Sequence, residues 1–161
     1  YKGFLYIGLM IRNNEPFLIE FNVRMGDPEC QVILPRLKSD FLNVIKMAEA
    51  DELKKSKIEW LNKKSMTIVL CSKGYPGNYK KNSLINNLEK IKLKNNEVIY
   101  HAGTKINHQK IFSNGGRVLN FTAVGQSYLS IRKRLIYLIK KLNWKNGFFR
   151  KDIGWRVISK K

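Results

Sequence analysis

The chain has 161 residues, 43% of them hydrophobic, and a formal net charge of +19. This length suits one domain or two small ones with a real core, and no apolar run reaches the roughly 18 residues of a transmembrane helix. The basic residues are mostly lysines scattered among asparagines and isoleucines, so we predict neither nucleic-acid nor membrane binding, although the charge favours small anionic substrates.

The chain begins at Tyr1, without an initiator methionine, and almost inside an expected strand. The first residues also lack the charged start and long apolar middle of a signal peptide. We therefore expect a piece of a longer cytoplasmic protein. Cys30 and Cys71 lie far apart in sequence and have no adjacent histidine, so we expect reduced thiols rather than nucleophiles.

The first expected elements are two strands, residues 4–11 and 17–23, joined as a hairpin by a turn at residues 13–16. A helix is then predicted from Asp27, as its cap, to about Leu37.

Within this predicted helix, Pro35 should end or kink it. Ser39 and Asp40 can cap a second helix, and residues 51–59 are charged enough for a short helix or a surface connection.

The second predicted strand carries a carboxylate, an amide and a guanidinium at alternate positions, Glu20, Asn22 and Arg24. Side chains two apart on a strand share a face, and the apolar residues between them should be buried on the other face: Ile19, Phe21 and Val23. Two hard oxygen ligands beside a guanidinium suit Mg²⁺ bound to nucleotide phosphates. Alternating polar residues also occur on a solvated sheet face, and that alternative stays open.

We place a domain boundary near residues 60–64. Beyond it, strands are expected at residues 66–72, 98–102 and 118–124, followed by a helix from Ser127 to about Leu142. The fold class is therefore α+β, with antiparallel strands and one long helix in the second half.

Several sequence blocks occur in one order along nearly the whole chain. They are Y-K-G-F-L-Y-I-G-L-M (1–10), I-E-F-N-V-R-M-G-D-P-E (19–29), Q-V-I-L-P-R-L-K-S-D (31–40), S-K-G-Y-P-G (72–77), H-A-G-T (101–104), S-N-G-G-R-V-L (113–119) and D-I-G-W-R (152–156). With these blocks the chain resembles the phosphoribosylamine–glycine ligases, also called glycinamide ribonucleotide synthetases, of the ATP-grasp superfamily. E-F-N-V-R alone would indicate only the superfamily.

The resemblance implies that residues 1–61 are the C-terminal part of an ATP-grasp domain and residues 62–161 the enzyme's C-terminal α+β domain. It implies a monomeric ligase of purine biosynthesis that joins glycine to 5-phosphoribosylamine, using ATP as co-substrate with Mg²⁺ or Mn²⁺. The N-terminal part of that enzyme is missing from this chain, so we expect the piece to be inactive alone. Another ATP-grasp carboxylate–amine ligase is the alternative.

By the same resemblance, Glu20 and Asn22 are the metal ligands, and Arg24 is the catalytic residue that contacts phosphate oxygens or the acyl phosphate. Asp27 and Glu29 either orient the glycine ammonium or hold the turn. Arg117, after Gly115 and Gly116, either faces an anionic substrate or simply follows a tight turn.

Overall fold

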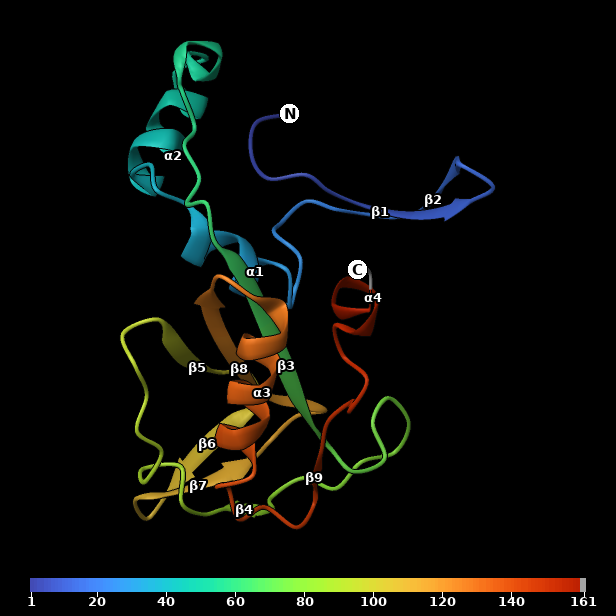
Figure 1. Ribbon diagram of the computed structural model, residues 1–161, viewed down its shortest axis with the longest axis vertical. Helices are drawn as coiled ribbons and strands as arrows, with labels where there is room; N and C mark the ends of the chain where they lie inside the picture. The colour runs from blue at the N-terminus through green and yellow to red at the C-terminus, as the bar shows by residue number, and fades with distance from the viewer. Residues whose placement is uncertain (160–161) are drawn as a thin grey trace. The chain divides into compact units, whose positions relative to one another are not determined.

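The computed structural model describes residues 1–159 and divides the chain into two compact units, Tyr1–Leu61 and Asn62–Lys161. Each unit combines helices with antiparallel strands (Figure 1). The α+β class predicted from the sequence is therefore confirmed. Within the described residues, no helix has both the length and the apolar character needed to span a membrane.

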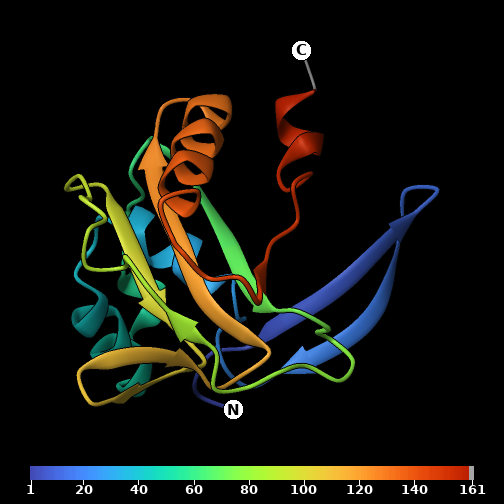
Figure 2. The same cartoon turned by 90° about the horizontal axis from the view of Figure 1, so that it is seen from below.

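The first unit starts with a hairpin of β1 (Tyr6–Arg12) and β2 (Glu15–Asn22), drawn in blue in Figure 2. Its two-residue turn is formed by Asn13 and Asn14, whose φ angles are 51° and 64°. Asparagine adopts this left-handed backbone more readily than most residues, and such turns match the twist of the flanking strands. Pro16, expected in the turn, is instead paired within β2.

The apolar face of β2 is exposed, contrary to the sequence-based prediction. Ile19, Phe21 and Val23 keep 60%, 59% and 72% of their surface accessible. The reason is that β1 and β2 form a two-stranded sheet, with no third strand paired to either edge among residues 1–159. Alternation of apolar and polar residues sets which side chains share a face, but it cannot supply the layer that would cover that face.

The rest of the first unit is helical and short. It comprises α1 (Cys30–Ile33), the 3-10 turn η1 (Leu34–Arg36), α2 (Phe41–Glu49) and the 3-10 turn η2 (Leu53–Lys55). As predicted, Asp40 caps α2, because its carboxylate accepts a hydrogen bond of 2.7 Å from the backbone N–H of Asn43. Pro35 lies in η1, where the α-helical hydrogen bonds give way.

The second unit contains two antiparallel sheets. The four-stranded sheet has the order β5 (Glu97–His101), β8 (Arg117–Gly125), β3 (Lys64–Ser72), β9 (Gly147–Phe148). The three-stranded sheet has the order β4 (Leu84–Ile85), β7 (Lys110–Ser113), β6 (Thr104–Asn107). The helices are α3 (Tyr128–Ile139) and the short α4 (Trp155–Ile158).

The core of the second unit lies between α3 and the four-stranded sheet (Figures 1 and 2). Ile68 of β3 is paired with Phe121 of β8, and both are at most 1% exposed. Leu135 and Leu138, three positions apart on α3, are buried against this face. The amphipathic spacing expected for this helix is present, although α3 ends at Ile139, before Leu142.

Candidate functional site

The polar residues of β2 lie on one face of the hairpin. Asn22 is paired with Tyr6, and Glu20 is paired with Gly8. The two pairs are two positions apart on each strand, with the Ile7–Phe21 pair between them, so Glu20 and Asn22 point to the same side. Glu20 is exposed and Asn22 is half-buried. A carboxylate oxygen and an amide oxygen are therefore presented together on an accessible surface.

Glycine at position 8 leaves room for the Glu20 side chain. A Cβ atom at Gly8 would lie 3.0 Å from Cγ of Glu20. The strand register also shifts directly beside this pair, because Gly8 faces Glu20 while Leu9 faces Leu18. Such a bulge re-aims the side chains next to it, so the orientation of Glu20 depends on an irregularity that sequence periodicity does not reveal.

Arg24 does not continue the alternation that the sequence suggested. β2 ends at Asn22, and residues 23–24 form a bend. The Arg24 guanidinium is exposed, and its Nη1 donates a hydrogen bond of 2.9 Å to the carbonyl oxygen of Met25. The structure therefore places Arg24 near the end of the polar face but outside the strand ladder.

Asp27 does not cap α1, contrary to prediction. Glu29 is the N-cap residue, and no side-chain hydrogen bond caps the helix. The Asp27 carboxylate instead accepts a hydrogen bond of 3.0 Å from Nε2 of Gln31.

Glu29 packs onto the turn that precedes α1. Its side chain folds over the buried Gly26, where a Cβ atom would lie 3.0 Å from Cδ of Glu29. The charge of Glu29, followed by burial, the hydrogen bond to Glu29 and the charge of Glu20, raises the pKa of Tyr6.

The sequence analysis missed Tyr6. Tyr6 is paired with Asn22 and so lies beside the polar face. This pairing can be predicted only when the register of the hairpin is known. A two-residue turn suggests that register, but the bulge changes it midway.

The donor set on this face fits a divalent cation that is shared with substrate phosphates. Among the described residues, no group of three or more His, Cys, Asp or Glu could hold a metal ion by itself. Mg²⁺ commonly takes one or two protein oxygens and completes its shell with phosphate oxygens and water. Glu20 and Asn22 offer such a pair, and this assignment stays a prediction.

Three of the resemblance blocks meet in the second unit, around the start of β8. Gly103 approaches the backbone so closely that a Cβ atom there would lie 2.5 Å from the carbonyl oxygen of Arg117. A Cβ atom on Gly116 would lie 2.5 Å from Cε2 of Tyr75, and Ser72 Oγ donates a hydrogen bond of 2.7 Å to the Gly115 carbonyl oxygen. Close packing of the chain therefore accounts for Gly103 and Gly116.

Arg117 itself is half-buried at the beginning of β8, where it is paired with Cys71. Its positive charge opposes the effect of burial, which raises the pKa of the Cys71 thiol. Nδ1 of His101 lies 2.9 Å from Oγ1 of Thr104. These contacts are structural, and the role of Arg117 toward a substrate remains a prediction.

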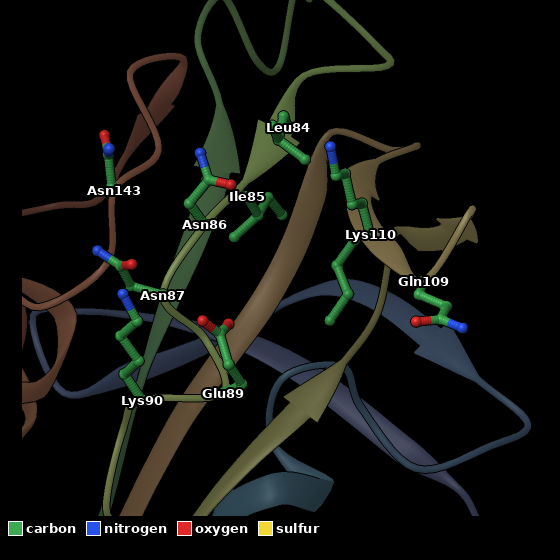
Figure 3. Close-up of a pocket in the computed structure, with 10 residues that line it drawn as sticks. Leu84, Ile85, Asn86, Asn87, Glu89, Lys90, Gln109, Lys110 and Asn143 are labelled. Atoms are coloured by element: carbon green, nitrogen blue, oxygen red, sulfur yellow. The ribbon is translucent and has the colours of Figure 1, made fainter.

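The second unit also contains a cavity of about 510 Å³ (Figure 3). Its lining includes none of the predicted site residues. In Figure 3 the apolar side chain of Ile85 lies between the amide side chains of Asn86 and Asn87 on one side and Lys110 on the other. Most of the polar lining side chains, including Asn86, Glu89 and Lys110, are exposed. The cavity is therefore an open hollow on the surface of the second unit.

Comparisons with known proteins identify the family. Residues 65–156, more than half of the chain, match the model of the phosphoribosylglycinamide synthetase C domain, and residues 1–30 match the ATP-grasp (A) domain of the same synthetase. The chain belongs to the phosphoribosylglycinamide synthetase family. The candidate metal strand thus lies in the part matched to the ATP-grasp domain, and Arg117 lies in the part matched to the C domain.

Curated relatives of the synthetase family carry the name phosphoribosylamine–glycine ligase. The chain is 45% identical over 154 residues to the protein of Caldanaerobacter subterraneus subsp. tengcongensis, covering 96% of this chain and 36% of that protein. It is 42% identical over 165 residues to the chloroplastic protein of Arabidopsis thaliana, covering 100% and 31%. The chain spans only 31–38% of the length of such relatives.

A solved structure agrees with these matches. The crystal structure of phosphoribosylamine–glycine ligase from Thermotoga maritima aligns with a TM-score of 0.72 and 29% identity, covering 92% of this chain and 36% of that one. The predicted resemblance to the synthetase family is therefore confirmed.

Proposed function

We propose that this chain is the C-terminal part of a ligase that joins glycine to 5-phosphoribosylamine and uses ATP as co-substrate. The C-domain match over residues 65–156 carries the proposal, because it separates this family from other ATP-grasp ligases. The oxygen-bearing face of Glu20 and Asn22 supports it, since ATP-driven ligation requires charge neutralisation at the phosphates. In this proposal the first unit completes an ATP-grasp domain, and the second unit is the C domain.

The proposed reaction has two steps. The glycine carboxylate attacks the γ-phosphate of ATP and releases ADP, which gives glycyl phosphate. The amine of phosphoribosylamine then attacks the acyl carbon, phosphate leaves, and glycinamide ribonucleotide forms. A bound divalent cation would neutralise phosphate charge during the first step.

The chain's own residues bind and position these groups. Glu20 and Asn22 hold the cation, and Arg24 contacts phosphate oxygens or the acyl phosphate through its exposed guanidinium. Asp27, Glu29 and Arg117 are proposed substrate contacts, and their present hydrogen-bond and packing partners limit how far each can move. The missing N-terminal part of the enzyme supplies the remainder of the nucleotide site, so these 161 residues alone are expected to be inactive.

The cellular location and the oligomeric state of the intact enzyme are also predictions. A purine-biosynthesis ligase of this family is proposed to act in the cytoplasm as a monomer, although the Arabidopsis thaliana relative is named chloroplastic.

Glu20→Ala in the full-length protein tests the proposal. Because Glu20 is exposed, the substitution should leave the melting temperature nearly unchanged, while ADP release that depends on both glycine and phosphoribosylamine should fall at least 100-fold, roughly as for loss of a metal ligand. Glu15→Ala is the matched control, since Glu15 is an exposed carboxylate at the other end of β2. Undiminished turnover in Glu20→Ala would refute the metal assignment, and ADP release without either substrate would refute the ligase.

A further inference from the structure

The hollow in the second unit is enclosed by stretches of chain that lie far apart in sequence (Figure 3). On one side β4 is paired with β7, where Ile85 lies opposite Ile111. The segment after α3 is attached to this pair, because Asn86 and Asn143 exchange two backbone hydrogen bonds of 3.1 Å. The walls of the hollow are therefore fixed by the fold of the second unit.

A hydrogen-bonded cluster braces two of these stretches. Ser83, directly before β4, accepts hydrogen bonds at its Oγ from Nε1 of Trp144 at 3.1 Å and from Nδ2 of Asn146 at 3.0 Å. Trp144 directly follows Asn143, which lines the hollow, and is 8% exposed. The polar groups of this cluster satisfy one another and serve the fold.

The amide side chains that line the hollow are different. Four of them face it, and none has a side-chain hydrogen bond to another of residues 1–159: Asn86, Asn87, Gln109 and Asn143. A carboxamide carries an acceptor oxygen and a donor NH₂ group side by side. The hollow therefore presents several paired donors and acceptors that the folded chain does not use.

Two ammonium groups and one carboxylate complete the polar lining. They belong to Lys90, Lys110 and Glu89, and no ion pair joins them to one another or to any other residue that the structure describes. In Figure 3, Lys90 lies on the same side as Asn87, and Lys110 lies on the opposite side of Ile85. Positive charge exceeds negative charge here, and the net charge of +19 on the whole chain also attracts anions.

The remaining lining is apolar and suits a flat ring. Leu84, Ile85 and Ile111 supply it; Ile85 is 3% exposed and the other two are half-buried. The volume of about 510 Å³ falls within the roughly 300–1,000 Å³ that is usual for small-molecule sites. Such sites combine apolar surface with a few polar groups that fix the orientation of the ligand.

We propose that this hollow is a binding site for an adenine nucleoside monophosphate. The base lies against the apolar side chains, and a carboxamide pairs with its amino group and a ring nitrogen, as Asn and Gln do with adenine in nucleic acids. A lysine binds the phosphate, and Glu89 accepts hydrogen bonds from the ribose hydroxyls. Two lysines beside one carboxylate favour a single phosphate over a triphosphate.

The test uses the full-length protein with ¹³C-labelled isoleucine methyl groups and adenosine 5′-monophosphate (AMP) as the probe. Titration with AMP should shift the methyl resonances of Ile85 and Ile111 along one saturating curve, whereas Ile68, 1% exposed in the core, should not shift. Adenosine and ribose 5-phosphate each carry half of the ligand and should bind at least about 10-fold more weakly than AMP.

Two substitutions locate the binding groups. Lys110→Ala and Asn86→Ala should each weaken AMP binding about 10-fold, and both should leave the melting temperature nearly unchanged because the two side chains are exposed. Lys105→Ala is the matched control, since Lys105 is an exposed lysine of the same hairpin that lies outside the lining. It removes the same charge and should not change AMP affinity.

Three results would overturn the proposal. The first is no shift at Ile85 and Ile111 up to about 10 mM AMP, beyond the range of specific binding. The second is equal weakening by Lys105→Ala and Lys110→Ala, which would mean general attraction of anions. The third is ribose 5-phosphate binding as tightly as AMP, which would mean that the base is not recognised. None of these readouts involves turnover, so failure of the proposed ligase reaction would leave the result unaffected.

Discussion

Arg134 on α3 donates two hydrogen bonds to the carboxylate of Glu97 on β5, from Nε to Oε1 at 2.7 Å and from Nη2 to Oε2 at 2.9 Å. The Glu97 side chain is only 2% exposed, whereas that of Arg134 is 28% exposed. The backbone N–H of Lys94 donates a further hydrogen bond of 3.0 Å to Oε2 of Glu97. Arg134 therefore joins α3 to the sheet through a buried carboxylate.

Arg134→Met should destabilise the protein by about 3 kcal/mol, because it leaves a buried carboxylate without its charged partner while keeping the apolar stem. Chemical denaturation of the chain measures this change. Lys133→Met is the matched control, since Lys133 is exposed on the same helix, and its effect should stay within about 0.5 kcal/mol. Equal effects of the two substitutions would show that the ion pair contributes no more than an ordinary surface charge.

The same pair predicts a pH dependence of stability. The hydrogen bond from Arg134 is the largest influence on the pKa of Glu97 and lowers it, against the opposing effect of burial. The stabilisation is therefore fully present above the unfolded-state pKa of glutamate, about 4.3, and is lost as the pH falls through the lower folded-state value. Denaturation between pH 3 and 6, compared with Glu97→Gln, should show a loss of stability on acidification that shrinks in the variant.

Gly116 packs against the ring of Tyr75, so the effects on stability of substitutions at these two positions should depend on each other. Gly116→Ala places a methyl group into the ring and should destabilise the chain by about 1–3 kcal/mol. Gly77→Ala is the control, because its new Cβ atom would lie 3.4 Å from the Gly74 carbonyl oxygen, an ordinary contact.

A smaller side chain at position 75 should relieve that clash. Thermal unfolding of Tyr75→Leu combined with Gly116→Ala should therefore show less destabilisation than the sum of the two single changes. Strict additivity would mean that the ring is not what excludes a side chain at position 116.

Both cysteines are expected to react slowly with thiol reagents. Burial raises the pKa of the Cys30 thiol, and the charge of Asp27 raises it further. Burial also raises the pKa of Cys71, with Arg117 opposing it. Since the thiolate is the reactive form, alkylation by iodoacetamide at pH 8 should be slower in the folded chain than in urea. Rapid alkylation of the folded protein at neutral pH would contradict this prediction.

Short-range rules were enough for elements whose signals are local. Alternation along residues 17–23 predicted a strand, and β2 covers most of that range. Asp40 was correctly predicted as a helix cap because a cap needs only the next few residues. The long apolar strand at residues 118–124 and the amphipathic helix after Ser127 appear as β8 and α3 for the same reason.

Other sequence-based predictions differed from the structure. The cap assigned to Asp27 was wrong, since its carboxylate bonds to Gln31 while Glu29 takes the N-cap position. Arg24 lies beyond the strand because pairing ends with the Tyr6–Asn22 pair. The exposed apolar face of β2 could not be foreseen from alternation, because coverage requires a second layer.

The order of residues by itself determined which side chains could act together within one element. Glu20 and Asn22 share a face because successive strand side chains alternate. Only the tertiary structure brought Tyr6 to that face, through its cross-strand pair with Asn22. The reason is physical: alternation repeats every two residues and can be read locally, whereas the register of a bulged hairpin and the path of a turn depend on contacts between residues far apart in the chain.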